Sequence, residues 1–279
     1  MINPSAAKIL IVTVIYNQKI TGTNVYKTLL SEEESVYIHD NSPNPQHTDG
    51  LPESWKYFSD PSNPGLSAAY NRAAGYAAAN GYDWLLLTDQ DTIFPENALA
   101  TYRRDIGEHT TQRLLIPSVK IPDGRYISPV KSRFYFPRPS TRKPVPGKIE
   151  LKEYAVINSG ILVTTDSFIS CGGYNENVFL DFSDFQFVER FASKYPEAWL
   201  MDMTCIQNFS NISDSTETKL TRFGLFCRSL SGYSSLKTFG KPMIAAVVLK
   251  RAVSLCLSAK SLRPLSIFFT NFKPYIKKL

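Results

Sequence analysis

The chain of 279 residues has 43% hydrophobic, 20% charged and 13% aromatic side chains, a composition that excludes fibrous and intrinsically disordered proteins. Its length suits one large α/β unit, alone or with an appendage. The net charge of +6 is unevenly spread: from Lys219 to Leu279 there are twelve Lys or Arg and no Asp or Glu, so nineteen basic and 25 acidic residues give the first 218 a net charge of −6. A basic tail of this kind indicates a polyanionic partner, either nucleic acid or an anionic membrane surface.

Targeting and redox signals are weak in this sequence. The four cysteines are spaced too widely for a CxxC-type zinc site or a disulfide framework, which favours a reducing compartment. The first apolar run has no basic segment before it and no small-residue cleavage site after it, so no signal peptide is expected. Charges at Lys250, Arg251 and Lys260 interrupt the apolar C-terminal region, so no transmembrane helix is expected. The sequence predicts a soluble or peripheral protein.

The first 90 residues alternate between buried strands and helices. Apolar β-branched runs predict strands, and an alanine-rich segment that ends at Gly81 predicts a helix with a glycine cap. In chain order we expect a strand at 9–15, a helix at 23–30, strands at 35–39 and 56–59, a helix at 67–80 and a strand at 84–88. This order predicts a Rossmann-like, mainly parallel sheet flanked by helices.

Polar residues follow three of these predicted strands. Asn17, Asp40 and the pair Asp89 and Asp91 all fall at carboxyl ends, where open α/β sheets bind their ligands. Residues 117–150, rich in Pro, Arg and Lys, are predicted to form a long loop over this edge.

The Asp89–Asp91 pair suits a hard divalent cation that also holds substrate phosphates. A solvated turn is the competing interpretation, because Asp is favoured in turns. The sequence has neither GxxxxGK[ST] nor GxGxxG, which removes the main support for a P-loop nucleotidase or a dinucleotide dehydrogenase.

Seven short blocks, together with Asn71, resemble the family 2 glycosyltransferases, and within them the bacterial rhamnosyltransferase-like enzymes of O-antigen and capsule assembly. The resemblance covers about residues 8–230, and the blocks occur in the family's order. They are residues 13–17, 39–42, 63–65, 87–91, 158–160, 172–176 and 179–184.

The resemblance implies a GT-A fold, a nucleotide-sugar donor, a divalent metal ion (Mn²⁺ or Mg²⁺) and inversion at the anomeric carbon. It assigns Asp40 to the nucleotide base or ribose, Asp89 to the nucleotide and also to the metal, Asp91 to the metal, and Asp184 to the catalytic base. Further residues that the family's pattern places in donor or acceptor binding are Thr13, Tyr16, Asn17, Asn41, Asn63, Gly65, Asn71, Gln90, Asn158, Gly160 and Asp181.

Two of these assignments have structural alternatives, and the catalytic base has a rival. Asp40 could close a turn by bonding the backbone two residues on, and Asp184 could cap the helix expected at 185–191. Asp181 is a rival for the catalytic base. In addition, relatives often carry Glu where this chain has Gln186, and His where it has Gln207, a weaker metal ligand than His. A non-catalytic, surface-binding protein on a degenerate transferase scaffold is therefore the second hypothesis.

The C-terminal region predicts an amphipathic helix at about 243–261. A narrow polar stripe recurs at Lys250, Ser254, Ser258 and Ser261 in an otherwise apolar segment. Docking on the protein's own core and adsorption to an anionic membrane are both open at this point. Adsorption would be helped by charges and rings at Lys260, Arg263, Phe268, Phe269, Phe272, Lys273, Lys277 and Lys278. A nucleic-acid role is disfavoured because no recognised nucleic-acid module is present.

The sequence thus predicts a GT-A domain at 1–230 and a basic helical extension at 231–279. The expected activity is transfer of a sugar from a dTDP- or UDP-sugar to a polyprenyl-diphosphate-linked saccharide, with no nucleic-acid partner. Rhamnose from dTDP-rhamnose is the preferred donor on resemblance, and galactosyl, galactofuranosyl or glucosyl transfer stays open. The expected location is peripheral, on the inner face of the cytoplasmic membrane.

Overall fold

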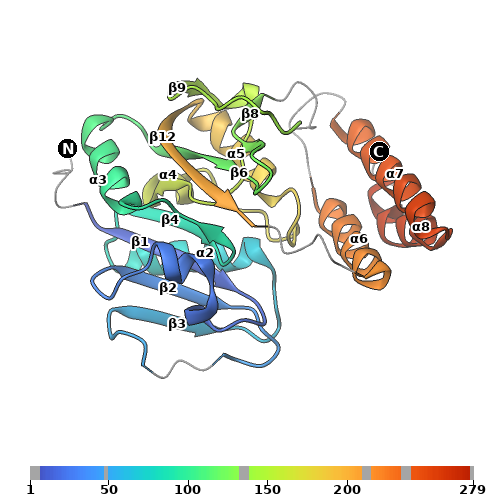
Figure 1. Cartoon of the computed structure of the whole chain (residues 1–279), viewed down its shortest axis with the longest axis horizontal. Coiled ribbons are helices and arrows are strands. Elements are labelled where there is room, and N and C mark those ends of the chain that lie inside the picture. Colours follow the sequence, from blue (N-terminus) through green and yellow to red (C-terminus); the bar gives the residue numbers. More distant parts are fainter. Residues whose placement is uncertain (1–6, 47–49, 132–137, 209–214, 234–239, 277–279) are drawn as a thin grey trace.

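A computed structural model describes residues 7–46, 50–131, 138–208, 215–233 and 240–276. A central sheet, layered with helices, forms most of the molecule, and three C-terminal helices lie together to one side of it (Figure 1). The order along the main path of the sheet is β3-β2-β1-β4-β11-β6-β12-β5.

The first half of the sheet is parallel, as predicted. It comprises β1 (Ile9–Ile15), β2 (Ser35–Asp40), β3 (Trp55–Ser59) and β4 (Trp84–Asp89), with β1 in the middle between β2 and β4. The central strands β1 and β4 are mostly apolar and buried on both faces, the pattern of a sheet covered by helices on each side, whereas β3 at the edge is partly exposed. Their carboxyl ends lie at one edge, so the residues that follow β1, β2 and β4 are brought together there.

The second half of the sheet is mixed. β11 (Leu162–Thr164) runs antiparallel to both β4 and β6 (Leu114–Lys120), and β12 (Glu197–Gln207) is parallel to β6. β5 (Thr92–Ile93) and β9 (Gly147–Glu150) pair with β12, and β7 (Tyr126–Ser128) pairs with β6. A small second sheet joins β8 (Val130–Lys131) to β10 (Tyr154–Ala155).

The prediction of a long loop at 117–150 was wrong for much of that range. Residues Pro117 to Lys120 belong to β6, a buried strand near the centre of the sheet, and β7, β8 and β9 follow it. This strand contains a proline, and the residues after it show little periodicity. No local pattern therefore indicated that it pairs with β12, which lies far along the chain. Residues 132–137 lie outside the described part of the chain.

Helices cover both faces of the sheet. Leu10 and Val12 of β1 pack in one cluster with residues of α2 (Leu66–Ala79), α4 (Thr165–Ser170) and α5 (Ser183–Lys194), whereas Ile9 and Ile11 pack with α1 (Asn24–Thr28) and α3 (Ala98–Glu108). This division follows from the alternation of side chains along a strand. The predicted helix at 67–80 is confirmed as α2, while that at 23–30 is shorter and follows a 3₁₀ turn, η2 (Ile20–Gly22). A second 3₁₀ turn, η3 (Leu151–Glu153), precedes β10.

Three C-terminal helices form a separate hydrophobic cluster: α6 (Thr216–Ser231), α7 (Gly240–Ala259) and α8 (Arg263–Ile276). Val178 joins this cluster, and the hydroxyl of Ser229 on α6 accepts a hydrogen bond from the Leu180 backbone at 3.1 Å. The cluster is therefore attached to the segment that leads into α5. Within the described residues, no helix has the length and apolar character needed to cross a membrane.

The two faces of α7 are both apolar but differ in burial. Ile244, Val248 and Ala252 are buried against α6 and α8, which is the core-docking arrangement that the sequence left open. On the other side, Leu249 and Val253 are about half exposed and Leu257 is 76% exposed. Lys250, Arg251, Ser254 and Ser258 are exposed as well, so the outer face of α7 combines apolar side chains with basic and hydroxyl groups.

Candidate active site

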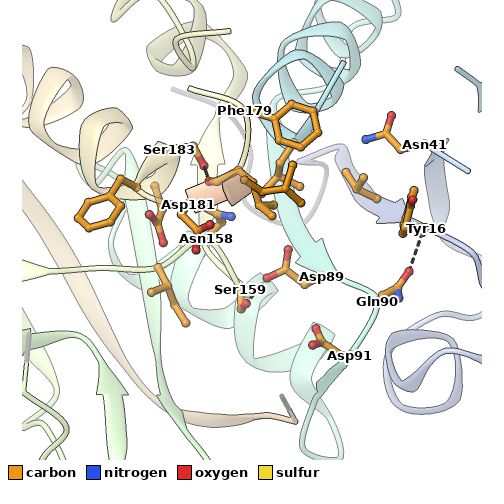
Figure 2. Close-up of a pocket in the computed structure, with 18 of the residues that line it drawn as sticks. Tyr16, Asn41, Asp89, Gln90, Asp91, Asn158, Ser159, Phe179, Asp181 and Ser183 are labelled. Atoms are coloured by element: carbon orange, nitrogen blue, oxygen red, sulfur yellow. Dashed lines mark hydrogen bonds between the residues drawn. The ribbon is translucent and has the colours of Figure 1, made fainter. Parts of the chain in front are cut away.

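A cavity of about 670 Å³ lies at the carboxyl ends of β1 and β4. Its volume falls within the range of small-molecule sites. It is lined by ten of the residues that the sequence had singled out: Tyr16, Asn41, Asn63, Gly65, Asp89, Gln90, Asp91, Asn158, Asp181 and Asp184. In Figure 2, Asp89 and Asp91 lie between the end of the cavity formed by Tyr16 and Asn41 and the end formed by Asp181.

Asp89, the last residue of β4, is held by hydrogen bonds to both of its carboxylate oxygens. Tyr70 of α2 donates to Oδ1 at 3.1 Å, and the Ser159 hydroxyl donates a short bond to Oδ2. Burial raises the pKa of Asp89, and these two donors oppose the shift. Ser159, in the loop before β11, and Tyr70, on α2, therefore fix the Asp89 carboxylate in one orientation.

Asp91 presents its carboxylate to the cavity with fewer protein partners. Gln207, at the end of β12, donates its amide Nε2 to Oδ1 at 2.5 Å, while the Gln207 carbonyl oxygen accepts from the Thr92 hydroxyl at 2.7 Å. In this orientation Gln207 offers Asp91 an N–H group and turns its oxygen away. Burial, and then the negative charge of Asp89, raise the pKa of Asp91, so a cation placed here would relieve repulsion between the two carboxylates.

These side chains fit a divalent ion only in part. No group of three or more His, Cys, Asp or Glu residues suited to a metal occurs in the described part of the chain. Asp91 has a second oxygen, Oδ2, to which no described side chain donates. Mg²⁺ and Mn²⁺ sites that share their ion with a substrate diphosphate need only one or two carboxylates. The donor set therefore suits an ion whose remaining ligands come from a phosphate group and water.

The opposite end of the cavity contains the aromatic ring of Tyr16 and the side-chain oxygen of Asn41, which is a hydrogen-bond acceptor. The backbone N–H of Tyr16 donates to Gln90 Oε1 at 2.8 Å, which links the loop after β1 to the loop after β4 (Figure 2). The Tyr16 side chain is about half exposed. Asn41 lines the cavity, and its buried Oδ1 has no hydrogen-bond partner among the residues that the structure describes. A buried acceptor of this kind is costly unless a ligand donates to it.

Residues 179–184 form another wall of the cavity and contact the start of α2. The backbone N–H of Leu66 donates to the Phe179 carbonyl at 3.0 Å. Gly65 has φ of 95°, and a Cβ there would lie only 2.4 Å from the same carbonyl oxygen. Glycine is therefore required at residue 65 both for its backbone angle and for the close approach of Phe179.

Asp184 lies in the first turn of α5, where its Oδ1 accepts from the Phe185 N–H at 2.8 Å. It is not the N-cap: that position is Phe182, with a left-handed backbone. Burial raises the pKa of Asp184 to about 7, with further contributions from the negative charges of Asp181 and Asp89. Burial also raises the pKa of Asp181, but Arg251 and Arg222 oppose the shift. A carboxylate whose pKa is close to neutrality is suited to accept a proton.

Five of the predicted residues do not line the cavity. Thr13 is buried and bonds the Thr88 hydroxyl. Asn17 has a left-handed backbone conformation, and its backbone N–H donates a hydrogen bond to the Ser42 hydroxyl. Gly160, with φ of 82°, packs against Tyr102, whose hydroxyl donates to the Gly160 carbonyl.

Asp40 and Asn71 also have structural partners. Asp40 is fully buried and accepts from the backbone of Ser42 and Gln46 at 2.8 Å, the turn-closing arrangement that the sequence left as an alternative. Asn71 exchanges hydrogen bonds with the backbone of Tyr174 at 2.8 and 2.9 Å and so holds the turn after Gly173.

Sequence reasoning missed two polar side chains at this site. Ser159 was noted only as part of a block, yet it orients Asp89. Arg222 on α6 lines the cavity from the C-terminal helices. Its only sequence signal was membership in the basic tail, which gave no indication that one of these charges faces the strand ends.

The fold of the chain is that of solved GT-A glycosyltransferases. TarS 1–349 from S. aureus in complex with UDP-GlcNAc matches with a TM-score of 0.53 at 14% identity, over 97% of this chain and 81% of that one. GalNAc-T7 with UDP, GalNAc and Mn²⁺ matches with a TM-score of 0.55 at 11% identity, over 98% and 57%. This chain has the GT-A fold.

The extent of these similarities is limited. The chain spans 44% of the length of another S. aureus TarS chain, which it matches with a TM-score of 0.52 at 15% identity over 88% of its own length. No family model matches the sequence. A search of the curated proteins also gives no match. At these identities the shared GT-A architecture is a statement about the fold.

Proposed function

We propose that this protein is an inverting, nucleotide-sugar-dependent glycosyltransferase. The observation that carries the proposal is that Asp91, with an oxygen facing the cavity, and Asp184, with a pKa near 7, line the same cavity at the strand ends of a GT-A fold. One carboxylate can serve the leaving diphosphate and the other the incoming hydroxyl. The UDP and UDP-GlcNAc bound by matched TarS chains support a nucleoside-diphosphate donor.

In the proposed reaction, the bond between the anomeric carbon and the diphosphate oxygen breaks, and its electron pair leaves with the diphosphate. The acceptor hydroxyl forms the new bond from the opposite face, and its proton passes to Asp184. A bound Mn²⁺ or Mg²⁺ would neutralise charge that develops on the leaving diphosphate. Asp91 would hold that ion through its carboxylate, Asp89 would support the donor through its fixed orientation, and Gln207 positions Asp91.

The nucleoside is proposed to lie at the Tyr16 and Asn41 end of the cavity. The unpartnered Asn41 Oδ1 can accept from the N3–H of a uracil or thymine base or from a ribose hydroxyl. Tyr16 offers a ring next to it. Among possible donors, dTDP-rhamnose is supported by the sequence resemblance, and a UDP-hexose by the ligands of the matched structures.

The acceptor is proposed to be a polyprenyl-diphosphate-linked saccharide in the assembly of a bacterial surface polysaccharide, reached from the inner face of the cytoplasmic membrane. Support for a membrane surface comes from the outer face of α7 and α8. Besides Leu249, Val253 and Leu257, this region exposes Leu262 by 75% and Phe269 by 57%. These account for half of the ten most exposed large apolar side chains of the described residues.

The charges around this apolar face favour an anionic lipid surface over a second protein. Exposed Lys250 lies on α7, exposed Lys260 lies between α7 and α8, and Arg263 at the start of α8 is paired with Glu217, the last acidic residue of the sequence. Basic residues contribute about 1 kcal/mol each near an anionic membrane, and apolar side chains add burial. Phe272 and Lys273, by their side chains, and Lys277 and Lys278 lie outside the described residues.

Nucleotide-induced thermal stabilisation tests the proposed function most directly. The purified chain is heated with UDP, dTDP or GDP, each with and without Mn²⁺. At a concentration of about 100 times Kd, a bound nucleotide stabilises the fold by about 2.7 kcal/mol, which raises Tm by several degrees. One nucleoside diphosphate should raise Tm in an Mn²⁺-dependent way and then support sugar transfer. If no nucleotide raises Tm, the non-catalytic alternative on the same scaffold is favoured instead.

A further inference from the structure

The charge balance of the cavity is unfavourable for a diphosphate. Four carboxylates line it, from Asp89, Asp91, Asp181 and Asp184. A nucleoside diphosphate brings further negative charge into a partly buried site, where repulsion between like charges is strong. One divalent ion at Asp91 would compensate only part of this charge, so a second source of positive charge near the diphosphate is needed.

Arg222 is the one basic residue among the described residues that line the cavity. It projects from α6, so it belongs to the C-terminal helices and not to the sheet that supplies the carboxylates. Its positive charge affects two carboxyl groups in different parts of the cavity, those of Asp91 and Asp181. Burial raises the pKa values of Asp91 and Asp181, and in each case the guanidinium of Arg222 is among the groups that oppose the shift.

The backbone that carries Arg222 is firmly anchored. The Ser215 hydroxyl caps α6 by accepting from the Thr218 N–H, and Arg263 of α8 forms a two-pronged ion pair with Glu217. The residue after Arg222, Phe223, is fully buried in the cluster of α6, α7 and α8. A long flexible side chain on a fixed helix can reach a ligand without a large movement of the backbone.

We propose that Arg222 binds the diphosphate of the nucleotide-sugar donor and stabilises it as it leaves. The inference rests on the proposed transferase function and adds a residue to it. The planar guanidinium can donate two parallel hydrogen bonds to phosphate oxygens, which a lysine ammonium cannot do with the same geometry. As the bond from the anomeric carbon to the diphosphate breaks, the electron pair and its charge move to the diphosphate oxygen, where Arg222 acts.

This role also gives the C-terminal helices a part in the reaction. Leu225, one turn from Arg222 on α6, lines the cavity as well. The sheet then provides the carboxylates, and the helical cluster provides the positive charge. Neither part alone contains the complete site.

The test compares a diphosphate with a monophosphate in four proteins: wild type, Arg222→Gln, Arg222→Lys and the control Lys219→Gln. Lys219 lies on the same helix, one turn earlier, is exposed and does not line the cavity. Calorimetry measures Kd for UDP and for UMP in the presence of Mn²⁺, or for dTDP and dTMP if the thermal screen selects thymidine. Full-length chain is used throughout.

Arg222→Gln should weaken UDP binding by about tenfold to a hundredfold and UMP binding by less than about threefold, because a charged hydrogen-bond pair is lost only where the second phosphate is present. Arg222→Lys should recover part of the UDP affinity, and Lys219→Gln should bind as wild type. With substrate, kcat should fall in Arg222→Gln and be partly restored by lysine.

Three outcomes would overturn the inference. An unchanged Kd for UDP in Arg222→Gln would mean that the guanidinium does not bind the diphosphate. Equal losses for UDP and UMP would mean that the substitution displaces α6, and Arg222 would then be a structural residue. If wild type binds UDP and dTDP no better than buffer components, the proposed function fails, and the role of Arg222 fails with it.

Discussion

The sheet with its covering helices, here called the sheet domain, differs from the C-terminal helices α6, α7 and α8 in how fully its apolar residues are buried and in the sign of its charges. In the sheet domain, apolar residues are buried in two clusters, one on each face, and four carboxylates are gathered at one edge. In α7 and α8, an apolar stripe stays exposed and the charges nearby are positive. The first region supplies most of the cavity lining, and α6 adds Arg222 and Leu225 to it. The second region exposes an apolar and basic surface, which is typical of a surface that binds a large partner.

The largest effect is expected at the base in the sheet domain. Asp184→Asn should lower kcat by about 10²- to 10⁴-fold with little change in donor binding, because general-base assistance is typically worth that much. Asp181→Asn should cost less. Steady-state kinetics with the true acceptor measure both variants. A larger loss of kcat in the Asp181 variant would transfer the base assignment to that residue.

Substitutions on the outer face of α7 should have a comparable effect on membrane binding but none on the chemistry, because these residues do not line the cavity. The triple variant Leu249→Ser, Val253→Ser, Leu257→Ser should bind anionic vesicles about a hundredfold more weakly, since each partly inserted apolar side chain contributes about 1 kcal/mol. Co-sedimentation with phosphatidylglycerol vesicles measures the change, and added salt should weaken wild-type binding.

Point variants are preferable to removal of residues 243–279, because that deletion would uncover Phe223 and Phe226 of α6. The matched control is Ile169→Ser, an exposed apolar residue on the sheet domain. Vesicle binding that is equal in the triple variant and in wild type would contradict a lipid-facing role. A second copy of this chain would then be the better candidate for covering α7, and light scattering would show the dimer.

Substitution of Asp91 tests whether a metal ion contributes to nucleotide binding at this site. Asp91→Asn should weaken Mn²⁺-dependent nucleotide binding tenfold or more while leaving the fold intact, because a neutral amide is a poorer ligand for a hard cation. Calorimetry of UDP binding with and without Mn²⁺ gives the comparison. Unchanged Mn²⁺ dependence would refute the assignment of Asp91 as a metal ligand.

The smallest effect concerns pH and the raised pKa of Asp184. A carboxyl whose pKa is about 7 in the folded chain, against an ordinary value of 3.8, contributes stability that is present below pH 4 and is lost as the pH rises through 7. Asp184→Asn should therefore be more stable than wild type at pH 8, by about 2 kcal/mol after allowance for solvent in the cavity, and nearly equal at pH 4.

Thermal unfolding at the two pH values checks this difference, and wild-type activity should rise with an apparent pKa near 7 because only the ionised carboxylate can accept the proton. Asp181→Asn serves as the control on the same loop. A stability difference that is independent of pH would show that Asp184 does not titrate in this range.

Local sequence pattern determined much of the sheet domain. The strands at 9–15, 35–40, 55–59 and 84–89 and the helix at 66–79 were predictable because short β-branched, aromatic or leucine-rich runs mark the strands and an alanine-rich, glycine-capped segment marks the helix. The placement of Asp89 and Asp91 at a ligand-binding edge followed from the parallel order. The same information identified both carboxylates and the basic character of the tail.

Tertiary structure decided what no local pattern could encode. β6 was missed because its partners, β11 and β12, lie far along the chain, and pairing across such distances leaves no local periodicity. Asp40 and Asn71 look like binding residues in sequence, and in the structure they bond backbone groups and the side chains of Tyr57 and Glu176 outside the cavity lining, while Asn41 lines the cavity. Whether a polar side chain meets a ligand or a turn depends on which groups surround it. Likewise, only the packing of α6 against α7 and α8 turns Arg222 toward the carboxylates and leaves the outer face of α7 exposed.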